Sequence, residues 1–336
     1  MTATASNGRL DQARWKALGK AIVLDYSIWI VLGLIVAVFS SLTDSFLTTL
    51  NLTNIMLHSA VLGVVVIGES ICLLSGKFDL SVGSTVGLTG AIAAWLMVSG
   101  QPAASGWELH PIAAIPIVLL VGMAVGLFNG FFIAKVGMNP LLTTLATMMI
   151  LRGLALIVTS GQGLHRFPDA YRFLGGGNLG PVPMAVVIML GLFLVFHFVL
   201  KHRVVGRHIH IVGGNAAAAR ACGIHVGRVE IFAFMMSGLL AAVGGILLSG
   251  RLNSAETKSG VGMELQVIAA AVMGGISLAG GRGKLINAIA GVLVVKSIES
   301  GLVMVDVPPF WIGFTTGVIL FLAILIDTLK TKLRWR

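Results

Sequence analysis

Residues 112–133 read IAAIPIVLLVGMAVGLFNGFFI, an apolar stretch without a charged side chain. A helix needs about 20 apolar residues to cross the hydrocarbon core of a bilayer. Strands of membrane β-barrels instead alternate between apolar and polar residues, a pattern that this unbroken run does not have. The stretch therefore predicts a membrane-spanning helix, and the rest of the chain can be tested against that class.

The composition of the whole chain agrees with a membrane protein. Of the 336 residues, 57% are hydrophobic and 11% are charged, and the mean hydropathy is +0.98. So few charged side chains cannot cover a soluble globule of this size. A net charge of +10 would suggest nucleic acid for a soluble protein, but here the basic residues gather between apolar runs. We expect membrane lipid around the chain and no nucleic-acid partner.

Charges, prolines and glycine clusters separate the apolar runs. The first run, at 28–39, has no small-residue cleavage pattern before Asp44, which predicts a retained span. We predict an all-α membrane protein, a polytopic helical bundle of about ten transmembrane helices with broken or re-entrant segments. The predicted spans are 22–42, 53–75, 80–99, 111–135, 140–160, 181–200, 229–250, 264–280, 285–304 and 310–328.

The basic residues also predict the orientation. Lysines and arginines are enriched in cytoplasmic segments, and here they precede the first run and follow the last. An even number of spans then puts both termini in the cytoplasm. The chain divides into a cytoplasmic segment at 1–21, a single transmembrane domain at 22–328 with a basic cytoplasmic loop at 201–228, and a cytoplasmic tail at 329–336.

Two segments between runs combine polar residues with helix breakers. Residues 75–84 (SGKFDLSVGS) join two predicted spans, and Ser81 is placed to cap the second of them. Residues 274–283 (GGISLAGGRG) predict either a broken or re-entrant helix or a tight cytoplasmic turn. Non-helical backbone at membrane depth is tolerated only where it is buried in protein or lines a water-filled cavity.

The long cytoplasmic loop contains a strong helix signal. Residues 216–221 (AAAARA) follow Gly-Gly-Asn at 213–215 and precede Gly223. Alanine-rich sequence with an Asn cap and a terminal glycine predicts a short, capped, exposed helix. Such a helix is either a rigid contact for a partner chain or an ordinary connector.

Four charged residues lie away from the ends of the predicted spans: Glu69, Arg152, Lys296 and Glu299. Each costs about 2.5–3.5 kcal/mol at a helix centre on insertion scales, so each needs a partner or an aqueous pathway. Lys296 and Glu299 can pair on one helix face. Glu69 is a candidate substrate acceptor or proton site, and Arg152 is expected to lie near a helix end and snorkel.

Glycines at four-residue spacing allow helices to approach closely in lipid. They occur as Gly122, Gly126 and Gly130, as Gly83 and Gly87, and as Gly313 and Gly317. Packing inside one subunit is the favoured interpretation of each set, and a subunit interface is the alternative.

In this order, the segments resemble the permeases of the ribose-type branch of bacterial ABC importers. The resemblance runs over nearly the whole chain after about residue 25. It rests on residues 76–84, on NPLLTTLATM at 139–148 followed by Arg152, on the glycine-rich loop at 206–224, and on Glu264 with the cluster at 274–283.

The resemblance implies a transport subunit of the bacterial inner membrane rather than an enzyme. Its partners would be an ABC ATPase, a periplasmic sugar-binding protein and a second permease copy or paralogue. No cofactor would bind this chain, because ATP and magnesium belong to the ATPase. The implied coupling residues are Gly206, Arg207, Gly213, Gly214, Asn215, Ala217, Ala218, Arg220, Gly223 and Ile224. The pathway or gate candidates are Glu69, Asp79, Ser81, Gly83, Ser84, Asn139, Pro140, Arg152, Glu264, Gly274, Gly275, Gly280 and Gly281.

The cargo stays open between a ribose-like pentose, a hexose and a deoxysugar. Two other transport functions remain as alternatives. One is a proton-coupled secondary transporter built around Glu69, and the other is an ABC permease for branched-chain amino acids or another small polar metabolite.

Overall fold

The structure is a computed structural model that describes residues 28–308 and 310–334. The predicted segment 1–21, the start of the first predicted span and the end of the tail lie outside these residues. The described helices are Ile28–Leu42, α2 Thr49–Leu74, α3 Val82–Met97, α4 Pro111–Phe131, the π-helix η1 Phe132–Val136, α5 Pro140–Val158, α6 Asp169–Gly176, α7 Met184–His202, α8 Val204–Gly214, α9 Ala216–Ala221, α10 Val226–Leu252, α11 Met263–Met273, α12 Leu285–Met304 and α13 Phe310–Arg334.

Two short strand pairings complete the described secondary structure. β1 (Leu164–His165) pairs antiparallel with β4 (Ser254–Ala255), and β2 (Asn178–Leu179) pairs antiparallel with β3 (Val182–Pro183).

Among the described residues, six helices are long and apolar enough to cross a membrane. They are α2, α4 with η1, α5, α7, α10 and α12. Four further apolar helices are shorter, namely Ile28–Leu42, α3, α11 and Phe310–Leu325. The predicted class, a helical membrane protein, is therefore confirmed. α3 and α11, with 16 and 11 residues, are shorter than the helix of about 20 residues that crosses a bilayer, so two of the predicted spans are not continuous helices.

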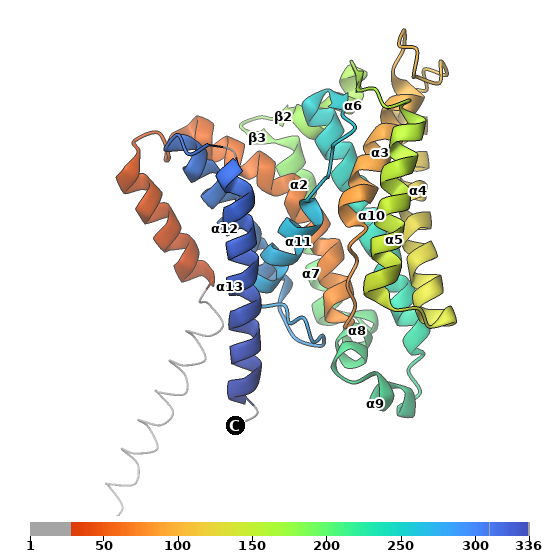
Figure 1. Cartoon of the computed structure of the whole chain (residues 1–336), viewed down its shortest axis with the longest axis vertical. Helices are drawn as coiled ribbons and strands as arrows, with labels where there is room; N and C mark the ends of the chain where they lie inside the picture. The colour runs from red at the N-terminus through yellow and green to blue at the C-terminus, as the bar shows by residue number, and fades with distance from the viewer. Residues whose placement is uncertain (1–27, 309, 335–336) are drawn as a thin grey trace, which may run out of the picture.

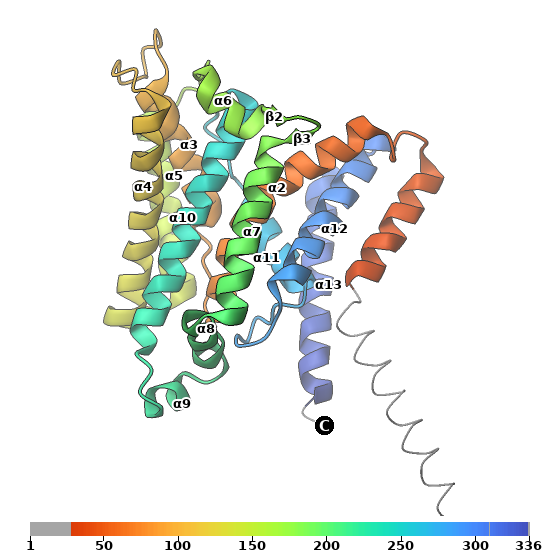
Figure 2. The same ribbon diagram turned by 180° about the vertical axis from the view of Figure 1, so that it is seen from behind.

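The core is built around α2 and α10. α2 is apolar on every side, and 89% of its most apolar window is buried, as expected of a helix without a polar face. α10 packs against α2, α3, α4 and α6. Figures 1 and 2 show α3, α4, α5 and α10 as one group of helices, with α12, α13 and Ile28–Leu42 on the other side of α2.

Glycine allows α4 to approach α10 closely. A Cβ atom on Gly126 would overlap the backbone carbonyl of Phe234, and the flanking glycines of α4 also face α10. Packing within one subunit is thereby confirmed for this set. The same interpretation is wrong for Gly313 and Gly317, because neither has a described atom within 4 Å of an added Cβ.

The two ends of the bundle differ. α8, α9 and the C-terminal end of α13 lie at one end, whereas α6 and the β2–β3 pair lie at the other (Figure 1). The 201–228 loop and the end of the chain are therefore on the same side of the bundle.

Candidate functional site

The first predicted break is present between α2 and α3. The chain leaves the helix after Leu74 and re-enters one at Val82, and Asp79 and Ser81 between them are buried. Ser81 occupies the N-cap position of α3, but its side chain makes no capping hydrogen bond. The predicted cap is wrong because the Ser81 hydroxyl donates to Asp79 Oδ1 instead, at 2.5 Å.

Asp79 is the centre of a buried hydrogen-bond network. Its Oδ1 also accepts from the Ser81 backbone N–H at 3.0 Å, and its Oδ2 accepts from the Ser237 hydroxyl at 2.9 Å. The Asn129 amide donates to the Ser81 hydroxyl at 2.9 Å and accepts from the Thr147 hydroxyl at 2.7 Å. The network ties the break between α2 and α3 to α4, α5 and α10.

Three members of this network were not among the predicted site residues: Asn129, Thr147 and Ser237. Each is a neutral polar residue within a long apolar helix, and Thr147 also lies in the segment 139–148 that carries the resemblance. Ser84, which the sequence did mark, is buried and donates to the Ser81 carbonyl at 2.8 Å.

Glu69 lies inside the bundle on α2 and has no exposed surface. Its Oε1 accepts from the backbone N–H of Asp79 at 3.3 Å, and its Oε2 has no partner among the described residues. In this conformation no substrate reaches the carboxylate, so a role as substrate acceptor would require another conformation.

A second break precedes α11. After β4 the chain folds back, and α11 begins beside the first turn of α3. A Cβ atom on Gly83 would overlap both the Gly260 carbonyl and the Glu264 carboxylate. The N-terminal ends of two short apolar helices, α3 and α11, therefore meet at one point.

An ion pair lies next to this meeting point. Arg152 Nη2 is 2.8 Å from Glu264 Oε1, and this contact joins α5 to α11. Arg152 was expected to snorkel to a helix end, but its guanidinium turns to the Glu264 carboxylate. A charge-assisted hydrogen bond to a carboxylate gives the guanidinium a partner within the bundle, so Arg152 does not have to extend to a helix end.

The predicted pair of Lys296 and Glu299 is confirmed, with 2.8 Å between Lys296 Nζ and Glu299 Oε2. Lys296 also donates to Gln266 at 3.0 Å, which adds a bond between α11 and α12.

Three glycine segments meet at the end of the bundle that carries α9. The Gly281 N–H donates to the Leu74 carbonyl at 2.9 Å, and His210 Nδ1 lies 3.2 Å from the Gly281 carbonyl oxygen. A Cβ atom on Gly213 would overlap the Leu74 carbonyl and approach the Gly281 nitrogen. We call this contact of residues 74–76, 210–214 and 280–281 the glycine junction.

The 274–283 segment is an irregular stretch between α11 and α12. Gly275 and Gly280 have φ of +84°, which favours glycine. Gly274 packs closely against the backbone of α12 at Asn287 and Ala288.

The helix predicted at 216–221 is present as α9. Asn215 Oδ1 accepts from the Ala218 N–H at 2.9 Å, and Gly223 has φ +79° after the helix. The sequence did not predict α8 before it. Ile209 and Val212 of α8 are buried, and a closely packed Gly206 allows the turn that leaves α7.

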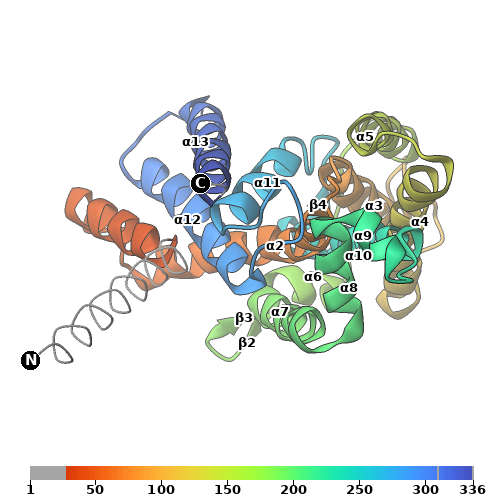
Figure 3. The ribbon, with the colours of Figure 1, turned by 90° about the horizontal axis from the view of Figure 1, so that it is seen from below.

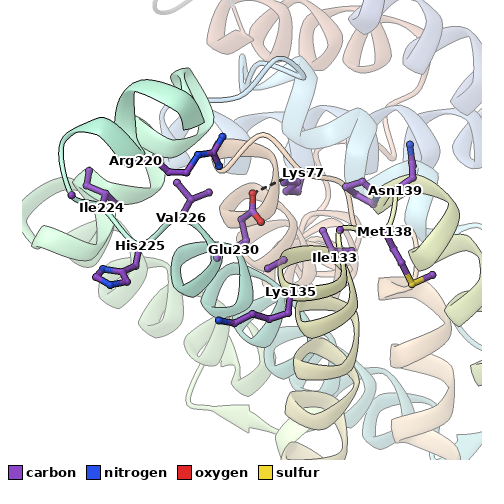
Figure 4. A pocket seen from close by; sticks show the side chains of 15 residues that line it. Lys77, Ile133, Lys135, Met138, Asn139, Arg220, Ile224, His225, Val226 and Glu230 are labelled. Carbon is purple, nitrogen blue, oxygen red and sulfur yellow. Dashed lines mark ion pairs between the residues drawn. The ribbon is translucent and has the colours of Figure 1, made fainter.

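A cavity of about 970 Å³ opens beside α9. Figure 4 shows Lys77 paired with Glu230 in this cavity, with 3.2 Å between Nζ and Oε1. Asn139, which caps α5, and Pro140 also line it. The structure thus places these two pathway candidates next to the predicted coupling residues Arg220, Gly223 and Ile224.

Comparison with known proteins gives one family. A family model described as the permease component of the branched-chain amino acid transport system matches residues 51–324. The chain is 35% identical over 315 residues to the ribose import permease protein of Escherichia coli (strain K12), covering 93% of this chain and 96% of the relative. It is 35% identical over 302 residues to the ribose import permease protein of Bacillus subtilis (strain 168), covering 89% and 91%.

A relative named for another sugar is nearly as similar. The L-arabinose transport system permease protein of Escherichia coli (strain K12) is 34% identical over 315 residues, which cover 91% of each chain. No solved structure matches the chain.

Proposed function

The chain belongs to this family of transport permeases, and on that premise we propose that it forms the membrane pathway of an ATP-driven importer for a monosaccharide. The relatives named for ribose and L-arabinose support a sugar as cargo, because their similarity covers about nine-tenths of both chains. A ribose-like pentose, a hexose and a deoxysugar are the cargoes to test.

The observation that carries the proposal is the glycine junction. Through it, the loop that bears α9 touches the ends of both broken segments, at Leu74 and at Gly281. A displacement of α9 is transmitted to these segments because their backbones are in direct contact, and side-chain rearrangement therefore cannot absorb it. The junction supports a role for α9 as the coupling helix that docks on an ATPase.

The proposed topology has about ten membrane-crossing segments with both termini in the cytoplasm. α3 and α11 each cross part of the bilayer as a helix, and the non-helical stretches next to them complete the crossing. The position of α9 and the end of α13 at the same end of the bundle supports this orientation (Figure 1).

The proposed assembly contains two permease chains, two ATPase subunits and a periplasmic binding protein. ATP binding closes the ATPase subunits, the two α9 helices move with them, and the pathway opens outward. The loaded binding protein then releases its sugar into the pathway. ATP hydrolysis resets the pathway to face inward, and the ATPase supplies the whole of that chemistry.

Import of branched-chain amino acids is the second candidate, because the family model carries that description. Uptake of labelled pentoses, hexoses, deoxysugars and branched-chain amino acids distinguishes the two, measured in cells with and without the gene. We expect sugar uptake that survives an ionophore and fails when ATP is depleted. Uptake of amino acids alone would show that the cargo is an amino acid rather than a sugar. Ionophore-sensitive uptake would point to a secondary transporter.

A further inference from the structure

The ion pair between Arg152 and Glu264 joins a partly exposed side chain to a buried one. The Arg152 side chain is 35% exposed, whereas Glu264 is 8% exposed. α5, which carries Arg152, is an apolar span with only 28% of its most apolar window buried. Because an exposed guanidinium in acyl chains is costly, the face of α5 that bears Arg152 must border water or another polar group.

The pair has unused hydrogen-bonding capacity. Arg152 Nε and Glu264 Oε2 are both buried, and neither has a hydrogen-bond partner among the described residues. The bond that joins the two side chains uses Arg152 Nη2 and Glu264 Oε1, and a guanidinium has five N–H groups in all. In this conformation a ligand can reach only the exposed part of the Arg152 guanidinium, and it reaches Glu264 Oε2 once the contact with Gly83 opens.

This pair lies where the first turns of α3 and α11 meet. Glu264 lies in the first turn of α11, and its Oε2 faces Gly83 in the first turn of α3. Viewed from the end that carries α9, α11 lies between α5 and α13 (Figure 3). Discontinuous helices near the bilayer midplane are where transporters form their substrate sites.

We propose that Arg152 and Glu264 form the site that holds the sugar during its passage through the permease. This inference rests on the proposed function. The substrate that fits the pair is a neutral polyol, whose neighbouring hydroxyls accept hydrogen bonds from the guanidinium and donate to the carboxylate. A hydroxyl does both, so a polyol binds without separating the two charges. A zwitterionic amino acid would have to separate them, since its own charges compete for both partners.

The first test replaces both charges at once. A pair with a purely structural role tolerates apolar replacement, because removing both partners leaves no uncompensated charge. We expect R152L/E264L to reach the membrane and to co-purify with the ATPase as the wild type does, and to take up sugar at least about tenfold more slowly through lost hydrogen bonds to charged groups. The conservative variants R152K and E264Q should raise KM and change the order of preference among sugars.

Normal uptake by R152L/E264L would overturn this inference and leave the proposed function standing. A wild type that imports no sugar under ATP supply would overturn the proposed function itself, and the inference with it.

The second test does not depend on how well the charge variants fold. Met149 lies one turn before Arg152 and is 65% exposed, and Leu194 on α7 is 64% exposed. In a Cys222→Ser background, Met149→Cys should react with a hydrophilic thiol reagent, and the transported sugar should slow that reaction. Leu194→Cys should react slowly, because α7 has no Asp, Glu, Lys or Arg between Met184 and Leu200 and is expected to border lipid there. Equal rates at the two positions, or no protection by sugar, would overturn the inference.

Discussion

Asp79 accepts a 2.9 Å hydrogen bond from the hydroxyl of Ser237, which ties the unwound segment before α3 to the middle of α10. With two further hydrogen bonds from Ser81, the buried carboxylate receives three donors from neutral groups. Burial of a carboxylate is tolerated only with such partners. The segment is therefore irregular in backbone but fixed in position.

Replacement of Asp79 by alanine should destabilise the chain more than loss of a single hydrogen bond. Three buried donors would lose their acceptor, and each unsatisfied group costs about 1–3 kcal/mol. Ser237→Ala removes one of the three donors to this buried carboxylate, so we expect a loss of about 1.5–3 kcal/mol. Thermal unfolding of the purified chain in detergent measures both. Equal losses for the two variants would contradict the central position of Asp79.

Gly83 should not tolerate a side chain, whereas Gly153 should. A Cβ atom on Gly83 would overlap the Gly260 carbonyl and the Glu264 carboxylate, while one on Gly153 meets nothing within 4 Å. We expect Gly83→Ala to lower the melting temperature by several degrees. Gly153→Ala should leave it unchanged or raise it, because alanine favours a helix by about 1 kcal/mol over glycine. The same shift in both variants would contradict the close contact between α3 and α11.

The sequence predicted those parts of the fold that depend on neighbouring residues. Apolar runs gave the helices, and the Asn215 cap and the Gly223 terminus gave α9, because capping is a local interaction. The sequence did not predict α8, because this helix lies within a basic loop and its buried apolar face is short. The breaks around 75–81 and 274–283 were visible as glycine and polar clusters.

The arrangement of the candidate site could not be predicted from local pattern. Arg152 and Glu264 are paired only because α5 and α11 lie side by side, and no local feature of the sequence links them. Asn139 was marked as a pathway candidate, yet the fold places it beside α9. The glycine junction likewise depends on three distant segments meeting, which isolated glycines do not reveal.

The stability of the chain should fall at alkaline pH through Tyr171, which lies in α6 outside the spans. Burial raises the pKa of Tyr171 above its usual range, partly offset by the hydrogen bond with Ser249 at 2.8 Å. The folded state thus keeps a proton that the unfolded chain releases above about pH 10. Stability is unaffected below that pH and decreases above it. Thermal unfolding from pH 8 to 11 should show a smaller decrease for Tyr171→Phe, and an unchanged decrease would contradict this role.

Alanine at Gly213 should uncouple ATP hydrolysis from transport. Its Cβ would overlap the Leu74 carbonyl and press on the Gly281 nitrogen, and so would force the glycine junction apart. α9 lies beyond the junction, and its cap at Asn215 is untouched, so the ATPase should still dock and hydrolyse ATP. In reconstituted vesicles we expect near-normal ATPase activity with sugar uptake reduced at least severalfold.

The neighbouring residue Gly214 is the matched control for that prediction. An added Cβ there meets nothing within 4 Å, so Gly214→Ala should transport normally. A bulky Gly214→Trp should instead obstruct docking of the ATPase, and ATPase activity and uptake should then fall together. If Gly213→Ala also lost both activities in proportion, the junction would be needed for assembly rather than for transmitting movement. If Gly213→Ala kept full uptake, the junction would carry no movement, and the path from α9 to the broken segments would have to run through α8 and α10.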